Sequence, residues 1–147
     1  MRKMLAMFVV VMVVGGSGAV NAEIIAECGA FEGHSYFFEG AFVSADDSGW
    51  DKDKISSGST SIVLIDKKFD VIFTDIAFKN KSSRADGASV IPLNINKDEA
   101  IITLLVNYEG FSSEFYTYHG QSKTLVLQQV KINSLINAAK MMVARCQ

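Results

Sequence analysis

Proline, tryptophan, histidine and cysteine are scarce in this 147-residue chain, which contains one, one, two and two of them respectively. With a single proline and no linker-like or low-complexity stretch, the sequence predicts one domain without an internal boundary. Any mechanism based on an imidazole must use His34 or His119. No Gly-x-Ser-x-Gly, His-Glu-x-x-His or phosphate-binding glycine loop accompanies either histidine. The sequence therefore argues against an enzyme and offers no candidate catalytic residue.

Clustered positive charge is also lacking. Lys79, Lys81 and Arg84 form the only dense basic stretch, and a solvated turn accounts for them. Because nucleic-acid binding depends on clustered Lys and Arg that neutralise phosphates, we expect no nucleic-acid partner. Neither cysteine has a second Cys or His nearby to complete a pair of ligands. We therefore expect no metal site and no cofactor.

The first 22 residues have the features of a secretory signal peptide. Two basic residues precede an unbroken apolar run over residues 4–14, and glycines then end it. Small and β-branched residues at the expected positions predict cleavage after Ala22. The run of 11 residues is too short for a membrane span, which needs roughly 20. We expect residues 1–22 to be removed, leaving 23–147 as a single β domain in the periplasm or secreted, without a membrane span.

Both cysteines, Cys28 and Cys146, belong to the mature domain. Loss of Arg2 and Lys3 reduces the 14 basic residues to 12 against 16 acidic ones, a net charge of about −4. In an oxidising compartment an even pair of cysteines predicts a disulfide. Closing a loop of about 118 residues would stabilise the fold by roughly 4–5 kcal/mol in the chain-entropy treatment.

Short runs of β-branched and aromatic residues alternate with turn-rich clusters along the domain. We predict strands over residues 35–43, 60–65, 69–78, 88–95, 101–108, 115–118 and 123–132. Pro92 places the fourth of these strands at a sheet edge or a bulge. Together they predict a mainly β fold: a single antiparallel meander of seven or eight strands, closed as a barrel or folded as a sandwich.

The last segment of the chain supports two predictions. Apolar residues between Leu135 and Cys146 recur with helical spacing after Ser134, a residue that could cap a helix, which predicts a short C-terminal helix. A strand over residues 140–146 that pairs beside the N-terminal region is the competing prediction and the one favoured here, because its two methionines and its valine could also fill a sheet that is apolar on both faces.

Three groups of residues carry a resemblance to known proteins: Glu27-Cys28-Gly29-Ala30 with residues 36–40, then residues 69–75, and finally residues 135–136 with 143–146. In these stretches the chain resembles small uncharacterised exported proteins of Gram-negative bacteria. The resemblance implies a periplasmic address, a bridge between Cys28 and Cys146, and a terminal strand in place of the helix. A terminal strand that returns to the first strand would place the two sulfurs side by side and leave no open edge.

Four carboxylates surround the only tryptophan in the polar connection over residues 44–59, and they form a candidate contact loop: Asp46, Asp47, Trp50, Asp51 and Asp53. Their spacing does not match an EF-hand, so we expect a solvated acidic loop rather than a calcium site. Trp50 either folds back as a lid on the core or stands out as a contact residue, and the lid is favoured.

These features constrain the function without specifying it. The leading hypothesis is a non-enzymatic exported binding or interaction module of the cell envelope, with an unknown protein or small ligand as partner. One alternative is a small-ligand carrier with a hollow β-barrel. Another is an inhibitor of a secreted hydrolase such as lysozyme, in which the acidic loop would insert into a basic target. An enzyme would need a pocket that holds both histidines.

Overall fold

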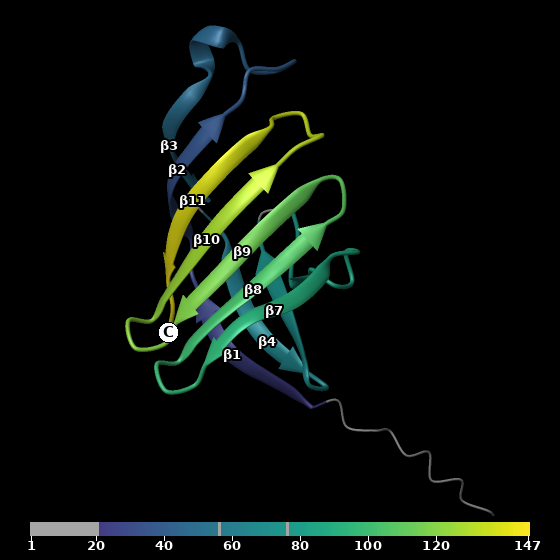
Figure 1. Ribbon diagram of the computed structural model, residues 1–147, viewed down its shortest axis with the longest axis vertical. Helices are drawn as coiled ribbons and strands as arrows, with labels where there is room; N and C mark the ends of the chain where they lie inside the picture. Colours follow the sequence, from purple (N-terminus) through teal and green to yellow (C-terminus); the bar gives the residue numbers. More distant parts are fainter. Residues whose placement is uncertain (1–20, 56, 76) are drawn as a thin grey trace, which may run out of the picture.

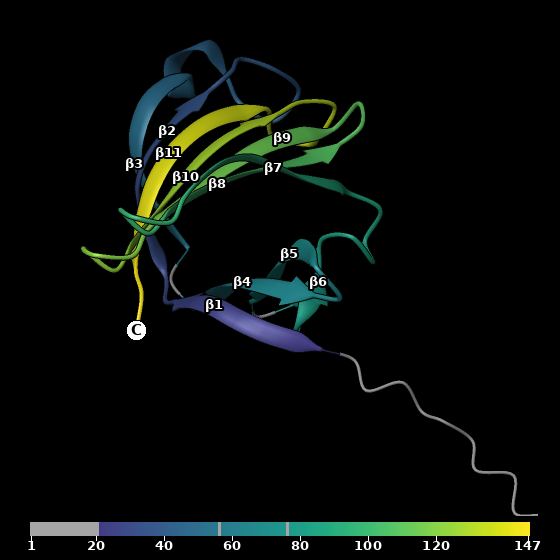
Figure 2. The same ribbon diagram turned by 60° about the horizontal axis from the view of Figure 1, so that its bottom comes forward.

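The protein is a sandwich of two antiparallel sheets that face each other as layers (Figures 1 and 2). The computed structural model describes residues 21–55, 57–75 and 77–147. The strand order is β1-β4-β5-β6 in the smaller sheet and β3-β2-β11-β10-β9-β8-β7 in the larger, strongly curved one. Nearly all of the predicted signal peptide lies outside the described residues.

The bounds of the strands are as follows. The smaller sheet consists of β1 (Ala22–Cys28), β4 (Ser59–Ile65), β5 (Lys68–Thr74) and β6 (Lys81–Ser82). The larger sheet consists of β2 (Phe31–Phe37), β3 (Gly49–Ile55), β7 (Ser89–Asn96), β8 (Ile101–Tyr108), β9 (Ser112–His119), β10 (Thr124–Lys131) and β11 (Ala138–Arg145). A short 3-10 turn, η1 (Ala45–Asp47), precedes β3. No helix within the described ranges is long and apolar enough to cross a membrane.

The prediction of a mainly β, antiparallel fold is confirmed. Of the two predicted architectures, barrel and sandwich, the molecule has the sandwich. The closed barrel and the single meander are wrong. The chain crosses between the layers from β1 to β2, from β3 to β4 and from β6 to β7, so the strands form two shorter meanders, β4 to β6 and β7 to β11, rather than a single one. Each sheet buries the face turned toward the other layer, so closure of one sheet on itself is not needed to form a core.

The C-terminal segment is a strand beside β2, so the predicted strand over residues 140–146 is confirmed and the alternative helix is wrong. β11 lies between β10 and β2, with Ala138 opposite Phe37 and Val143 opposite Glu32. Along β11 the buried side chains alternate, as expected for a sheet in which one face covers the core. Pairing with a neighbour on each side outweighs the helical spacing of the sequence, since tertiary context overrides local propensity.

The polar connection predicted over residues 44–59 is wrong in its second half, because residues 49–55 form the edge strand β3. Charged side chains suit an edge strand, since they discourage pairing with another chain. Trp50 on this strand is 68% exposed and packs edge-on against Tyr36, with ring centroids 5.5 Å apart. The lid prediction is therefore wrong, and Trp50 stands out from the surface. Pro92 lies on the opposite edge strand, β7, where the pairing register shifts, as predicted.

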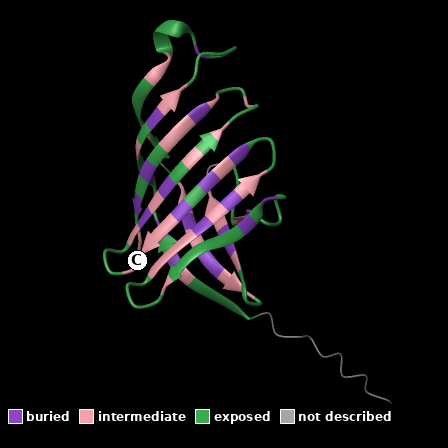
Figure 3. Ribbon diagram, viewed as in Figure 1, coloured by how far each residue is buried: buried purple, intermediate pink, exposed green. Residues whose placement is uncertain are grey.

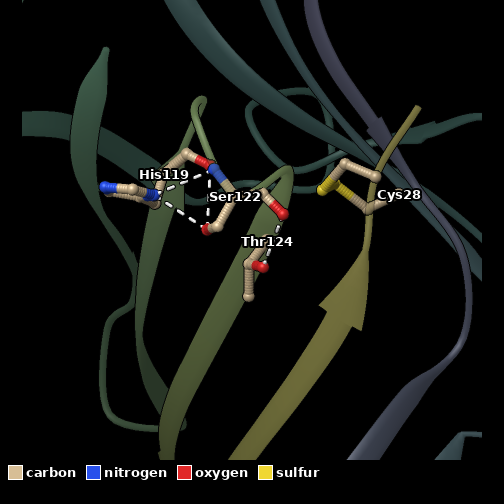
Figure 4. Close-up of a disulfide and its surroundings, with 5 residues drawn as sticks. Cys28, His119, Ser122 and Thr124 are labelled. Atoms are coloured by element: carbon tan, nitrogen blue, oxygen red, sulfur yellow. Dashed lines mark hydrogen bonds between the residues drawn. A yellow bond between two sulfur atoms is a disulfide. The ribbon is translucent and has the colours of Figure 1, made fainter. Parts of the chain in front are cut away.

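The core lies between the two sheets, where buried residues alternate with exposed ones along the strands (Figure 3). Its largest fully buried side chains come from both layers: Ile62 and Val71 from the smaller sheet, and Leu104, Leu125 and Met142 from the larger. The predicted disulfide is confirmed (Figure 4), with the Cα atoms of Cys28 and Cys146 3.8 Å apart. It joins the end of β1 to the residue just after β11, and so ties the two layers together at one end of the sandwich.

Candidate ligand-binding cavity

A cavity of about 380 Å³ lies between the two sheets. Its volume falls within the range of small-molecule sites in proteins. Apolar side chains from both layers and from the adjoining loops supply most of its walls: Phe31, Ile55, Phe73, Phe78, Phe111 and Leu127. On the larger sheet the cavity lies away from the disulfide, since Gln129 in its lining is five residues along β10 from Thr124, which pairs with the neighbour of Cys146. On the smaller sheet it comes close to the disulfide, because Thr60 in its lining pairs with Cys28.

A buried carboxylate stands among these apolar walls. Glu114 on β9 is only 9% exposed, and its Oε1 accepts hydrogen bonds from the Ser112 hydroxyl at 3.0 Å and the Gln129 amide at 2.7 Å. Its Oε2 accepts a hydrogen bond from the Tyr116 hydroxyl at 2.8 Å. Because residues 112, 114 and 116 alternate along one strand, they share its inner face, and the β9–β10 register sets Gln129 opposite Glu114.

Two tyrosines beside this carboxylate remain hydrogen-bond donors at neutral pH. Burial raises the pKa of the Tyr116 phenol well above its ordinary value of 10.0, and the charge of Glu114 raises it further. Burial also raises the pKa of Tyr108, although a hydrogen bond with Ser83 lowers it in part, and the charge of Glu114 adds to the rise. Both phenols therefore keep their protons and face the cavity as neutral groups.

Charged residues also line the cavity on the side of the smaller sheet. The Lys81 ammonium lies 2.7 Å from an oxygen of Asp86 and 4.1 Å from the centre of the Phe78 ring. The Asp75 carboxylate accepts hydrogen bonds from two backbone amides of the following turn, each at 2.7 Å. With Glu114, the lining contains three carboxylates and one ammonium, a balance of −2.

The residues of the candidate contact loop are not brought to one place. Asp46 and Asp47 lie in η1. On β3, Trp50 lies on one face of the strand, and Asp51 and Asp53 lie on the other. Of the five, Asp53 makes the closest tertiary contacts, and its Oδ2 accepts hydrogen bonds from Lys140 at 2.7 Å and Ser35 at 2.6 Å. Within the described part of the chain, no three potential metal ligands gather.

The Asp53 carboxylate is stabilised in its charged form. Burial alone would raise its pKa, but the hydrogen bonds from Lys140 and Ser35 and the charge of Lys140 together hold the pKa below its ordinary value of 3.8. This pair joins the edge strand β3 to β11 across β2, so its role is structural.

The two histidines lie apart on the larger sheet. His34 on β2 shares a row with Met141, Gln128 and Phe115, and His119 is four residues farther along β9 from that row. The His119 ring accepts a hydrogen bond at Nδ1 from the Ser122 amide at 3.2 Å, and the Ser122 hydroxyl lies 2.8 Å from the same nitrogen (Figure 4). Neither histidine lines the cavity.

A second hollow of about 870 Å³ is bounded by loops at one end of the strands of the larger sheet. Phe42 and Leu135 in its lining are strongly exposed, and Phe111 lines both this hollow and the cavity. The hollow lies outside the space between the layers and contains no buried carboxylate in its lining.

Sequence reasoning did not identify the cluster around Glu114. The signal was present in the order Ser112-x-Glu114-x-Tyr116-x-Tyr118, which puts polar groups on the face of a strand that also carries core aromatics. A polar residue in a core-facing position is informative because its burial requires hydrogen-bond partners.

Comparison with protein families, with curated proteins and with solved structures finds no match for the chain. The resemblance to exported proteins of Gram-negative bacteria therefore stays a prediction.

Proposed function

We propose that this protein is a non-enzymatic binding module that holds a small organic ligand in the cavity between its two sheets. The observation that carries the proposal is a cavity of about 380 Å³ whose walls are mainly apolar and which contains a hydrogen-bonded polar group, Glu114. Apolar walls with a few placed polar groups are typical of small-molecule sites. The proposed ligand site therefore lies between the two layers of a sandwich, and not inside the β-barrel that the ligand-carrier hypothesis assumed.

The apolar walls would supply most of the affinity. Burying about 200 Å² of apolar ligand surface is worth about 5 kcal/mol at 25 cal/mol per Å², before the cost of immobilising the ligand. The hydrogen-bonded cluster would orient the ligand, because the positions of its donors and acceptors are held by the pairing of β9 with β10.

The cavity makes a small ligand the leading proposal, ahead of a hydrolase as partner. Of the four aspartates that an acidic inhibitory loop would use, Asp53 is engaged by Lys140 and Ser35, whereas Asp46, Asp47 and Asp51 are exposed. Export to the periplasm or medium remains part of the proposal and rests on the sequence of residues 1–22.

The experiment is a fluorescence titration of the mature protein with N-phenyl-1-naphthylamine, a neutral apolar dye that brightens when it leaves water. We expect saturable binding that is lost in Ala30→Trp, because Ala30 lies exposed in the lining of the cavity and a bulky ring there would obstruct it. Ala41→Trp is the matched control, since Ala41 lines only the outer hollow. Binding lost in the control but kept in Ala30→Trp would place the dye in the loops and contradict the proposal.

A further inference from the structure

We infer that the ligand of this cavity is an organic cation, an amine or quaternary ammonium group on an apolar body, whose charged end is held by Glu114 among aromatic rings. This inference rests on the proposed function and adds the chemical class of the ligand.

The Glu114 carboxylate is hydrogen-bonded but lacks a positively charged partner among the residues that the structure describes. Its three hydrogen-bond donors, Ser112, Tyr116 and Gln129, are all neutral groups. None of the ion pairs found among the described residues includes Glu114. A carboxylate has about four acceptor positions, so one remains for a further donor. A buried charge without a counter-charge is costly, and a ligand cation beside Glu114 would remove that cost.

Aromatic rings line the same cavity as Glu114. Rings from both layers and from two loops face the same cavity: Phe31, Phe73, Phe78, Tyr108, Phe111 and Tyr116. Aromatic faces attract ammonium groups through their quadrupoles, and the attraction grows when water is excluded. The lining already places one ammonium this way, since Lys81 lies 4.1 Å from the centre of the Phe78 ring with Asp86 as its counter-ion.

The balance of charge separates this class from the alternatives. Asp86 offsets Lys81, which leaves Asp75 and Glu114 as two negative charges in the lining. A carboxylate or phosphate headgroup would meet Glu114 with no cation beside it and would be repelled. A neutral ligand would satisfy the apolar walls but would leave the charge of Glu114 uncompensated. A cation on an apolar body fits the apolar walls and also compensates the charge of Glu114.

The experiment compares three probes with one carbon skeleton, 4-phenylbutylamine, 4-phenylbutanol and 4-phenylbutyrate, by calorimetric titration of the mature protein at about pH 7. We expect the amine to bind at least about tenfold more tightly than the alcohol, and the carboxylate to bind most weakly. Glu114→Gln should abolish the preference for the amine over the alcohol. Glu109→Gln, the same change in the exposed turn between β8 and β9, should behave as wild type.

The outcomes separate the two proposals. If the alcohol or the carboxylate binds as well as the amine, the inference about charge is wrong while the binding function stands. The same holds if none of the three binds but N-phenyl-1-naphthylamine does. If neither these probes nor the dye bind, both proposals are wrong. The ranking of probes on the wild-type protein decides the inference even if Glu114→Gln does not fold, and circular dichroism shows whether it does.

Discussion

The inner face of the larger sheet carries two polar groups with different surroundings. Glu114 is surrounded by neutral donors and borders a cavity, whereas Asp53 has a cation, Lys140, at 2.7 Å. A paired carboxylate stabilises the fold, and an unpaired one in a cavity is available to a ligand. This contrast is why we assign binding to the first and a structural role to the second.

Asp53 should make stability depend on pH in a definite direction. Its pKa is lowered in the folded state, so the stabilisation is present above the unfolded value of 3.8 and is lost as the pH falls through the folded value. Asp53→Asn should therefore lower the free energy of unfolding by about 1–2 kcal/mol near pH 7. Urea unfolding measured from pH 7 downward should show the two proteins converge in acid.

Asp46→Asn is the control for that series, because Asp46 is exposed in η1. Its stability should match wild type at every pH. A difference between wild type and Asp53→Asn that persists in strong acid would show that the pair with Lys140 is not its source.

At the scale of elements, the pairing of β2 with β11 is the junction on which the larger sheet depends. β2 and β3 lie in the chain between β1 and β4 of the smaller sheet, and only β11 joins them to the meander from β7 to β11. Gly33 on β2 lies opposite Met142, and a Cβ atom there would stand 2.1 Å from the carbonyl oxygen of Met141. The two backbones are therefore close enough to require glycine at this position.

Gly33→Ala should disrupt this junction. Because the clash is with backbone rather than with a flexible side chain, we expect a loss of at least about 2 kcal/mol in the free energy of unfolding. Gly40→Ala is the matched control, since no heavy atom lies within 4 Å of the Cβ it would add. Thermal unfolding of both variants measures the difference, and equal midpoints would contradict the close approach of β2 and β11.

Local patterns predicted some elements and not others. The hairpin of β4 and β5 and the strands from β8 to β10 have apolar or alternating residues between short turns, and their positions were predicted. β3 was missed because its charged residues resemble a loop, although they suit an edge strand. β11 has helical spacing, and only the resemblance and the cysteine pair favoured the strand. The cluster at Glu114 depends on register between strands, which no local pattern specifies.

At the scale of the whole molecule, the cavity begins beside the disulfide on the smaller sheet, at Thr60, and extends away from it on the larger sheet, to Gln129. The bridge between Cys28 and Cys146 ties the layers near the buried side chains of Leu125 and Ala144. The smaller sheet has four strands against seven, and its last strand has only two residues, so it covers less of the curved face opposite. A space between layers tied at one end can open to a ligand without loss of the core.

The central claim is that a ligand enters between the sheets, and the most direct test is an amide NMR titration of the ¹⁵N-labelled mature protein with 4-phenylbutylamine and with N-phenyl-1-naphthylamine. We predict that shifts with either probe concentrate on residues that line the cavity, among them Phe73, Glu114 and Gln129. His34, which lies on the outer face of the larger sheet, should not shift. Shifts confined to the exposed loops around Phe42, or spread evenly over the surface, would contradict the account.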